Sequence, residues 1–242
     1  VLTSVDSLAA AENYFEKALS LAEYVDDIYS SLLIKTELAH NSYQQNNYDK
    51  ALKLLNQVQT LSKKYDLTQL FGVQEFYKGK IFCAQRKNNL SDRNLENAFN
   101  ISGEVHDYNN QIEAAYLLGK NFDERTEYSK AETWYNNAIK IIERISLSLT
   151  LNQEIQISHF SGVNSVYNSL AELYLKQGKG KEAFFIIDKA RSRNTKSNLN
   201  RLKLLAHLKN ESEYKQLIDL QWMITSGLYD KSVTDSLDQL LA

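Results

Sequence analysis

Proline is absent from the 242 residues of this chain, and glycine occurs only eight times. Average usage of about 5% proline and about 7% glycine would give a dozen prolines and about twice as many glycines. Sheet-rich chains need frequent turn residues with special dihedral angles, whereas helix interiors tolerate neither proline nor much glycine. The composition therefore predicts an all-α protein whose helices are joined by short connections.

The chain also has only one cysteine, Cys83, and no apolar run as long as a membrane-spanning helix, which needs about 18 residues. A single cysteine excludes an internal disulfide and a thiol cluster for zinc, and it is typical of a reducing compartment. We therefore expect a cytoplasmic protein that does not associate with membranes. The chain begins at Val1 rather than at Met, as a processed piece or an excised domain would.

No group of residues in the sequence has the pattern of a catalytic or metal site. The four histidines are scattered, and Gly178 and Gly180 form a lone G-x-G that no strand precedes. Cys83 would need a nearby base to act as a nucleophile, and a core or groove-lining cysteine is the simpler interpretation. We expect no enzyme activity, no catalytic residue, no cofactor and no metal.

Basic residues gather in segment 176–209, which holds ten Lys or Arg and two acidic residues. Its net charge of +8 leaves −10 for the rest of the chain, because the whole chain carries −2. Such a segment is a solvated helix face, an internal docking surface, or a site for an acidic partner or nucleic acid. We favour internal docking through Lys189, Arg191 and Arg193, and we expect only weak, nonspecific binding of nucleic acid.

A triplet of positions recurs along the chain: a small residue, a large apolar residue four later, and a small residue three after that. Three successive steps between triplets span 40 residues, and the last spans 52. The triplets are Ala11/Phe15/Ala18, Ala51/Leu55/Val58, Ser91/Leu95/Ala98, Ala131/Tyr135/Ala138 and Ala183/Ile187/Ala190. Twelve residues before each of the last four stands another small residue, namely Ala39, Gly79, Gly119 or Ala171. Because small residues let two helix axes approach closely, the pattern predicts antiparallel helix pairs that repeat about every 40 residues.

These features resemble the tetratricopeptide repeat (TPR), whose first helix carries Leu-Gly-x-x-Tyr and whose second carries Ala-x-x-x-Phe-x-x-Ala. Residues 117–141 match this pattern best, and 170–190 match it nearly as well. The usual repeat has about 34 residues, so the longer period predicts helices about one turn longer. The resemblance implies a right-handed TPR superhelix, an α-solenoid, over residues 1–193. The expected helices cover 6–23, 28–45, 48–64, 69–87, 91–105, 108–125, 128–147, 153–177, 180–193 and 195–209, with two shorter ones in 212–242.

The segment after the fifth triplet resembles the junction in bacterial CHAT proteins, where a TPR array leads into a caspase-like protease domain. Ala183, Asp188 and residues 189–193 carry this resemblance, with Asp188 in place of the usual Glu. The chain ends at Ala242, where the protease of the family would begin. The resemblance therefore implies that residues 194–242 form C-terminal capping or linker helices, and neither catalytic residue of the family can be placed here.

TPR proteins bind ligands on the concave wall formed by their first helices, at positions five and nine of each. The corresponding residues here are Thr36, His40, Phe76, Lys80, Tyr116, Lys120, Asn168 and Glu172. His40, Lys80 and Lys120 would form a ladder for an acidic peptide or a chain terminus. Phe76 and Tyr116 would add flat apolar contact. The alternative is a solvated face whose lysines pair with Asp123, Glu124 or Glu172.

Two functions follow from the resemblance. In the first, the chain is a non-catalytic scaffold that binds a protein, peptide or ribonucleoprotein activator in its groove and positions a CHAT-type protease outside these residues. In the second, it is an independent TPR regulator that senses a signal peptide by changing its curvature. An open reading frame that continues into a caspase-like domain would support the first, and an upstream helix-turn-helix would support the second.

Overall fold

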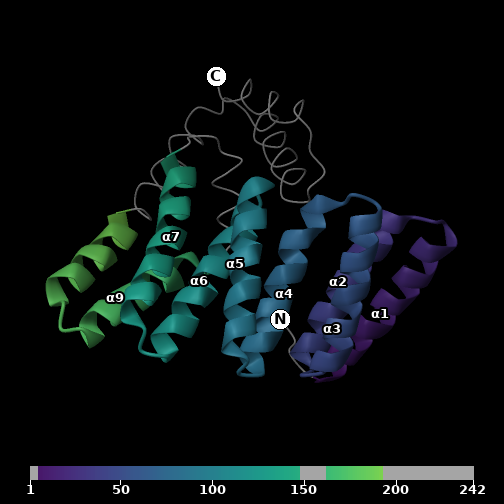
Figure 1. Cartoon of the computed structure of the whole chain (residues 1–242), viewed down its shortest axis with the longest axis horizontal. Coiled ribbons are helices and arrows are strands. Elements are labelled where there is room, and N and C mark those ends of the chain that lie inside the picture. Colours follow the sequence, from purple (N-terminus) through teal and green to yellow (C-terminus); the bar gives the residue numbers. More distant parts are fainter. Residues whose placement is uncertain (1–4, 148–161, 193–242) are drawn as a thin grey trace, which may run out of the picture. The chain divides into compact units, whose positions relative to one another are not determined.

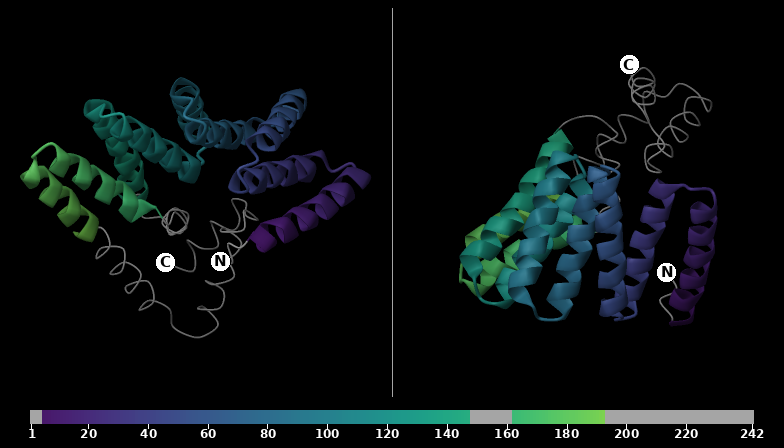
Figure 2. Two further views of the ribbon diagram at one scale, coloured as in Figure 1. Left: turned by 90° about the horizontal axis from the view of Figure 1, so that it is seen from below. Right: turned by 45° about the vertical axis from the view of Figure 1, so that its right-hand side comes forward.

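The computed structural model describes residues 5–147 and 162–192, and all the regular secondary structure in these ranges is helical. Two compact units divide the chain, Val1–Asn121 (unit 1) and Phe122–Ala242 (unit 2). The helices are antiparallel neighbours joined by short turns, as Figures 1 and 2 show within each unit. The predicted all-α helical-repeat fold is therefore confirmed.

Several helices in the described ranges have the same length. Four of them are 17 residues long: α2 (Ile28–Gln44), α3 (Tyr48–Lys64), α5 (Asn88–Glu104) and α6 (Tyr108–Glu124). A 3₁₀ turn, η1 (Thr68–Leu70), leads into α4 (Phe71–Ala84), so these two together occupy the same length. The others are α1 (Val5–Tyr24), α7 (Tyr128–Leu147), α9 (Val163–Lys176) and a helix over 180–192.

The turn between successive helices has one conformation, which recurs every twenty residues. Its middle residue has a positive φ of 55–60° in the first six turns, although none of these residues is glycine. They are Asp26, Asn46, Asp66, Arg86, His106 and Thr126, and Gly178 takes the same place 52 residues after the last. The sequence composition gave no sign of this conformation, because glycine is its usual occupant.

Two hydrogen bonds define this turn as a Schellman motif, which satisfies carbonyl groups at the end of a helix. In the first turn the Asp27 amide donates to the Ala22 carbonyl over 2.9 Å, and the Asp26 amide donates to the Glu23 carbonyl over 3.3 Å. The Asp27 carboxylate then accepts from the Ser30 amide at 3.0 Å and caps the next helix. One turn of three residues thus ends one helix and begins the next.

Replacing Thr126 by glycine is expected to raise the free energy of unfolding by about 1 kcal/mol. A left-handed conformation strains any L residue, and a β-branched one most of all, whereas glycine adopts it freely. Thr133, exposed in the middle of α7, is the matched control, since glycine there should lower stability by up to about 1 kcal/mol. Urea unfolding of both variants measures the two effects, and a loss of stability in the Thr126 variant would contradict the assigned turn.

Unit 1 has a core built from the second and third predicted triplets, whereas Ala18 of the first triplet is exposed. Ala51, Leu55 and Val58 of α3 have no exposed surface, and neither do their counterparts in α5. Leu55 packs with Ala39 of α2 and Ile81 of α4 in one cluster, and Val58 packs with Leu32 and Leu70 in another. In unit 2, Ala131 and Ala138 of α7 are fully buried, and α7 packs against α9.

The expected helix ranges agree with the described helices apart from a few ends. The expected helix 69–87 is shorter, and α5 begins at Asn88 instead of residue 91, because the turn occupies residues 85–87. The expectations for 148–161 and 193–242 lie outside the described residues. The boundary at residue 193 between repeat array and C-terminal helices, and the right-handed superhelix, remain predictions.

Candidate functional site

The first helices of successive pairs lie next to one another in unit 1. We call the surface formed by α2, α4 and α6 up to Asn121 the first-helix face. The thiol of Cys83 on α4 donates to Oδ1 of Asn121 over 3.1 Å, and Nδ2 of Asn121 donates to Oγ of Ser91 over 3.0 Å. That hydroxyl donates to the carbonyl of Gly79 over 3.0 Å. These bonds hold α4, α5 and α6 in register, and they give Cys83 a structural role.

Lys80 lies near the middle of this face with its ammonium group over aromatic rings. Its Nζ is 5.3 Å from the ring centroids of both Tyr43 and Phe76, and 5.7 Å from that of Tyr77. Rings at this distance attract a cation through their quadrupoles. The residue is half-buried and makes neither a hydrogen bond nor an ion pair to the part of the chain that the structure describes. Its three donor hydrogens are thus available to a ligand.

Charged and aromatic groups of three helices, α2, α4 and α6, surround Lys80. Burial lowers the pKa of its ammonium, and the carboxylate of Glu113 on α6 opposes that effect. Burial also raises the pKa of Glu113, although Lys80 counteracts it. The ring of His40 stacks on that of Tyr77 with centroids 4.9 Å apart. Burial, followed by the charge of Lys80, lowers the pKa of His40, so this ring is mainly neutral at pH 7. The face therefore holds one half-buried cation beside a half-buried carboxyl group.

Tyr77 was not among the predicted site residues, yet it lies at the centre of this arrangement. Burial, followed by the carboxylates of Glu37 and Glu113, raises the pKa of its hydroxyl. Glu37 is on α2 and Glu113 is on α6, so the hydroxyl lies near acidic groups of both neighbouring helices. Tyr43 and Glu113 were also missed, because neither occupies the fifth or ninth position of its helix.

The predicted groove residues of unit 1 differ in accessibility. His40, Phe76 and Lys80 come together as described, although Phe76 is only 3% exposed. Thr36 is buried, and its hydroxyl donates to the Leu32 carbonyl of its own helix over 2.9 Å. On α6, the Nζ of Lys120 lies 6.0 Å from the ring centroid of Tyr116, and Lys120 is exposed. Glu113, which lies on α6 and interacts with Lys80, adds a negative group to the predicted basic ladder of His40, Lys80 and Lys120.

Unit 2 holds the two remaining predicted groove residues, Asn168 and Glu172. Both are exposed on α9, and they line a cleft of about 380 Å³ between α9 and the helix over 180–192. Most of the cleft wall is apolar, and Phe184 in that wall is 72% exposed. Asp123 was expected to pair with the groove lysines if they formed only a solvated face. It instead accepts a hydrogen bond from Lys176 at 2.7 Å.

Basic residues of segment 176–209 contact acidic residues within unit 2. Nζ of Lys189 lies 2.6 Å from the carboxylate of Glu143 on α7, and Lys176 pairs with Asp123 at 2.7 Å. Lys179 lies 3.8 Å from Glu132. Arg191 is exposed, and Arg193 lies outside the described residues. These ion pairs support the interpretation that the basic segment docks within the chain.

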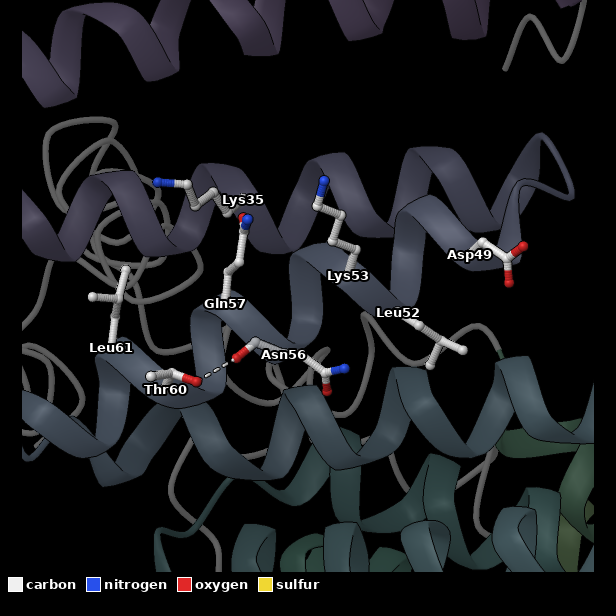
Figure 3. Close-up of a pocket in the computed structure, with 8 residues that line it drawn as sticks. All are labelled: Lys35, Asp49, Leu52, Lys53, Asn56, Gln57, Thr60 and Leu61. Atoms are coloured by element: carbon white, nitrogen blue, oxygen red, sulfur yellow. Dashed lines mark hydrogen bonds between the residues drawn. The ribbon is translucent and has the colours of Figure 1, made fainter.

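A second hollow, of about 790 Å³, lies along α3 in unit 1 (Figure 3). Lys35 of α2 lines it together with seven residues of α3, among them Lys53, Asn56 and Gln57. Lys35 already pairs with Glu23 at 2.7 Å, and no described aromatic residue lines this hollow. The first-helix face, which combines aromatic rings with a lysine that has no ion-pair partner among the described residues, is therefore the stronger candidate for a binding site.

Within residues 5–147 and 162–192, no three His, Cys, Asp or Glu side chains gather as metal ligands would. None of the described helices combines the length and the apolar character needed to span a membrane.

No family model matches the sequence, and no curated protein matches it either. Among solved structures, the crystal structure of BtubC (BKLC) from P. vanneervenii is similar, with a TM-score of 0.61. The similarity covers 79% of this chain and 75% of that chain at 16% sequence identity. At this identity the comparison supports the all-α helical-repeat fold alone.

Proposed function

We propose that the chain is a non-catalytic interaction scaffold that binds a peptide or protein segment on the first-helix face of unit 1. The observation that carries the proposal is the half-buried ammonium of Lys80, which lies over three rings and has no acceptor among the described residues. A partly desolvated charge without an acceptor binds an anionic ligand more strongly than an exposed lysine does.

The chemistry of the face favours a peptide with an acidic side chain or a terminal carboxylate. The carboxylate would accept hydrogen bonds from Lys80, and the rings of Tyr43 and Tyr77 would contact neighbouring side chains. Glu113 also favours a basic residue elsewhere in the same ligand. A solenoid suits such a ligand because its neighbouring helices present repeated side-chain positions along an extended segment.

The resemblance to TPR arrays of CHAT proteins extends this proposal. The scaffold would bind a protein or ribonucleoprotein activator and position a protease domain outside residues 1–242, in the cytoplasm. The ion pairs of Lys176 and Lys189 with acidic residues elsewhere in unit 2 support a role of the basic segment within the polypeptide, in agreement with weak binding of nucleic acid.

Selection from a display library of random twelve-residue peptides tests the function. We expect the wild-type chain to enrich peptides with acidic residues, because only an acceptor satisfies Lys80. Replacing Lys80 by methionine keeps most of the apolar stem and removes the charge, and it should weaken the enriched peptides about tenfold to hundredfold. Isothermal titration of synthetic copies of those peptides gives the affinities.

Lys53→Met is the matched control, since Lys53 is an exposed lysine of the same unit and lines the hollow of Figure 3. Its affinity should stay within about twofold of wild type. The absence of any enriched peptide, or an equal loss in the two variants, would contradict the proposal.

A further inference from the structure

A cleft in unit 2 presents uncovered apolar side chains. It has a volume of about 380 Å³ and lies between α9 and the helix over 180–192. Phe184 in its wall is 72% exposed and Leu175 is 61% exposed, whereas Ala183 is buried and Ile187 is half-buried beside them. Large apolar side chains that gather around a hollow mark a surface at which another element docks. The cleft is therefore a candidate docking site.

The equivalent surface in unit 1 is covered by the first helix of the next pair. Each residue that lines the cleft has a counterpart 132 residues earlier in α2 or α3, as Ala183 has in Ala51. There Ala51 and Leu55 pack in one cluster with Ile81 of α4, and Tyr77 of the same helix packs on that cluster. Neither Ala51 nor Leu55 has any exposed surface. The cleft therefore fits a helix like α4, which presents two large apolar residues four positions apart.

The sequence that follows the cleft has the pattern of such a helix. Residues 193–242 lie outside the described residues and follow directly on the helix that forms one wall of the cleft. In them, Leu204 and Leu208 stand on either side of Ala206, as the two large residues of α4 stand on either side of Gly79. A large apolar residue directly before a small one marks several first helices and recurs at Leu205-Ala206; the earlier pairs are Leu38-Ala39, Leu118-Gly119 and Leu170-Ala171. Segment 195–209 thus has the pattern of a first helix.

Charge complementarity favours the same segment. Residues 195–209 contain four Lys or Arg and no Asp or Glu, and the exposed side chain of Glu172 lines the cleft. Opposite charges at the border of an apolar contact select the partner and fix its register.

We propose that residues 195–209 of this chain pack into the cleft as a helix, with Leu204 and Leu208 on its floor. The two leucines would contact Ala183 and Ile187. The argument is continuity with an interface that the chain already forms, since α4 covers the same positions of α2 and α3.

This packing would change the role of two predicted groove residues. Asn168 lines the cleft and is exposed, but its counterpart Thr36 is buried. Segment 195–209 would therefore cover Asn168 and bring its basic side chains beside Glu172. Ligand binding would then remain with the first-helix face of unit 1.

A single thiol placed in the cleft tests whether the cleft is covered. In whole chains that carry Cys83→Ser, Gly180→Cys adds a thiol to the cleft wall, and Lys181→Cys adds one at the next position, which is exposed but does not line the cleft. We expect the thiol at 180 to react with dithiobis(nitrobenzoic acid) at least about tenfold more slowly than the thiol at 181. Leu208→Glu should remove most of that difference, and circular dichroism checks that the helix content is retained. Equal rates of the two thiols without Leu208→Glu would overturn the proposal.

A chain whose own segment is released should bind that segment as a separate peptide. We expect a fluorescently labelled peptide of residues 195–209 to bind the Leu204→Glu/Leu208→Glu chain at least about tenfold more tightly than the wild-type chain, whose cleft is already occupied. In the released chain Phe184→Glu should abolish binding. Phe185→Glu is the matched control, because Phe185 is 64% exposed but does not line the cleft, and its effect should stay within about twofold.

Three results of this second experiment would overturn the proposal. They are equal affinities of the released and wild-type chains, equal effects of the two phenylalanine substitutions, and a wild-type dimer that Phe184→Glu dissociates. The last result would assign the cleft to a second copy of the chain.

Discussion

Replacing Gly79 by valine is expected to lower the free energy of unfolding by about 2–3 kcal/mol. A Cβ atom at Gly79 would lie 2.6 Å from Cγ and 2.8 Å from Cδ2 of Leu95, and 3.2 Å from the backbone nitrogen of Leu95. These distances are too short for carbon atoms, and Leu95 has no exposed surface into which it could move. Helix α5 would have to move away from α4. Urea unfolding, followed by circular dichroism, measures the loss.

A second substitution separates the steric effect from a general loss of helix stability. Leu95→Ala alone should cost about 2–5 kcal/mol, because it leaves a cavity in the core. In the presence of Gly79→Val, the valine partly fills that cavity, so the double variant should lose at least about 1 kcal/mol less than the sum of the two single losses. Gly180→Ala, at a helical glycine with open space around it, should not destabilise at all. Additive losses would contradict the close approach of α4 and α5.

Removing the carboxylate of Glu75 is expected to cost roughly 3 kcal/mol. Glu75 and Lys78 of α4 are both buried, with 9% and 8% exposure, and Gln59 of α3 links them. Nζ of Lys78 donates to Oε1 of Gln59 over 2.9 Å, and Nε2 of Gln59 donates to the Glu75 carboxylate over 3.1 Å. Asn97 of α5 donates to the other carboxylate oxygen over 3.1 Å. Glu75→Ala would leave the two amide groups without their acceptor, and it would remove the negative charge that compensates the buried ammonium of Lys78.

The charge of Lys78 in this network is stabilised by the carboxylate of Glu75. Burial lowers the pKa of Lys78, and the negative charge of Glu75 partly restores it. Lys78→Met in the Glu75→Ala background removes the unpaired charge, so the double variant should regain most of the lost stability. Glu75→Gln, which keeps an acceptor but not the charge, should have an intermediate stability. A loss below about 0.5 kcal/mol for Glu75→Ala, measured by urea unfolding, would contradict a buried network.

The fold was largely predictable because its strongest signal is local. Small residues such as Gly79 and Ala131 mark helix crossings, and an absence of proline over the whole length leaves few alternatives to helix. The turn conformation was not predicted, because Arg86, His106 and Thr126 are unusual occupants of a left-handed position. Only their spacing of twenty residues could have revealed it.

The candidate site was predictable in part, and for a geometric reason. The register of small residues leads to Phe76 and Lys80, since Lys80 directly follows Gly79 on α4 and Phe76 lies three residues before it. Tyr43 and Glu113 come from other helices at other register positions, and the rotation between neighbouring helices decides which side chains reach Lys80. A sequence read one helix at a time contains no information on that rotation.

The combination of 17-residue helices with three-residue turns makes residue number itself a structural constraint. Each residue advances a helix by about 100°, so deleting a single residue from α3 would rotate Leu55 and Val58 away from the core. The turns cannot compensate for this rotation, because their three residues also end one helix and cap the next. Insertions and deletions should therefore be tolerated in the described repeats only as whole helix pairs of about forty residues, because a single helix with its turn would put a first helix in the place of a second.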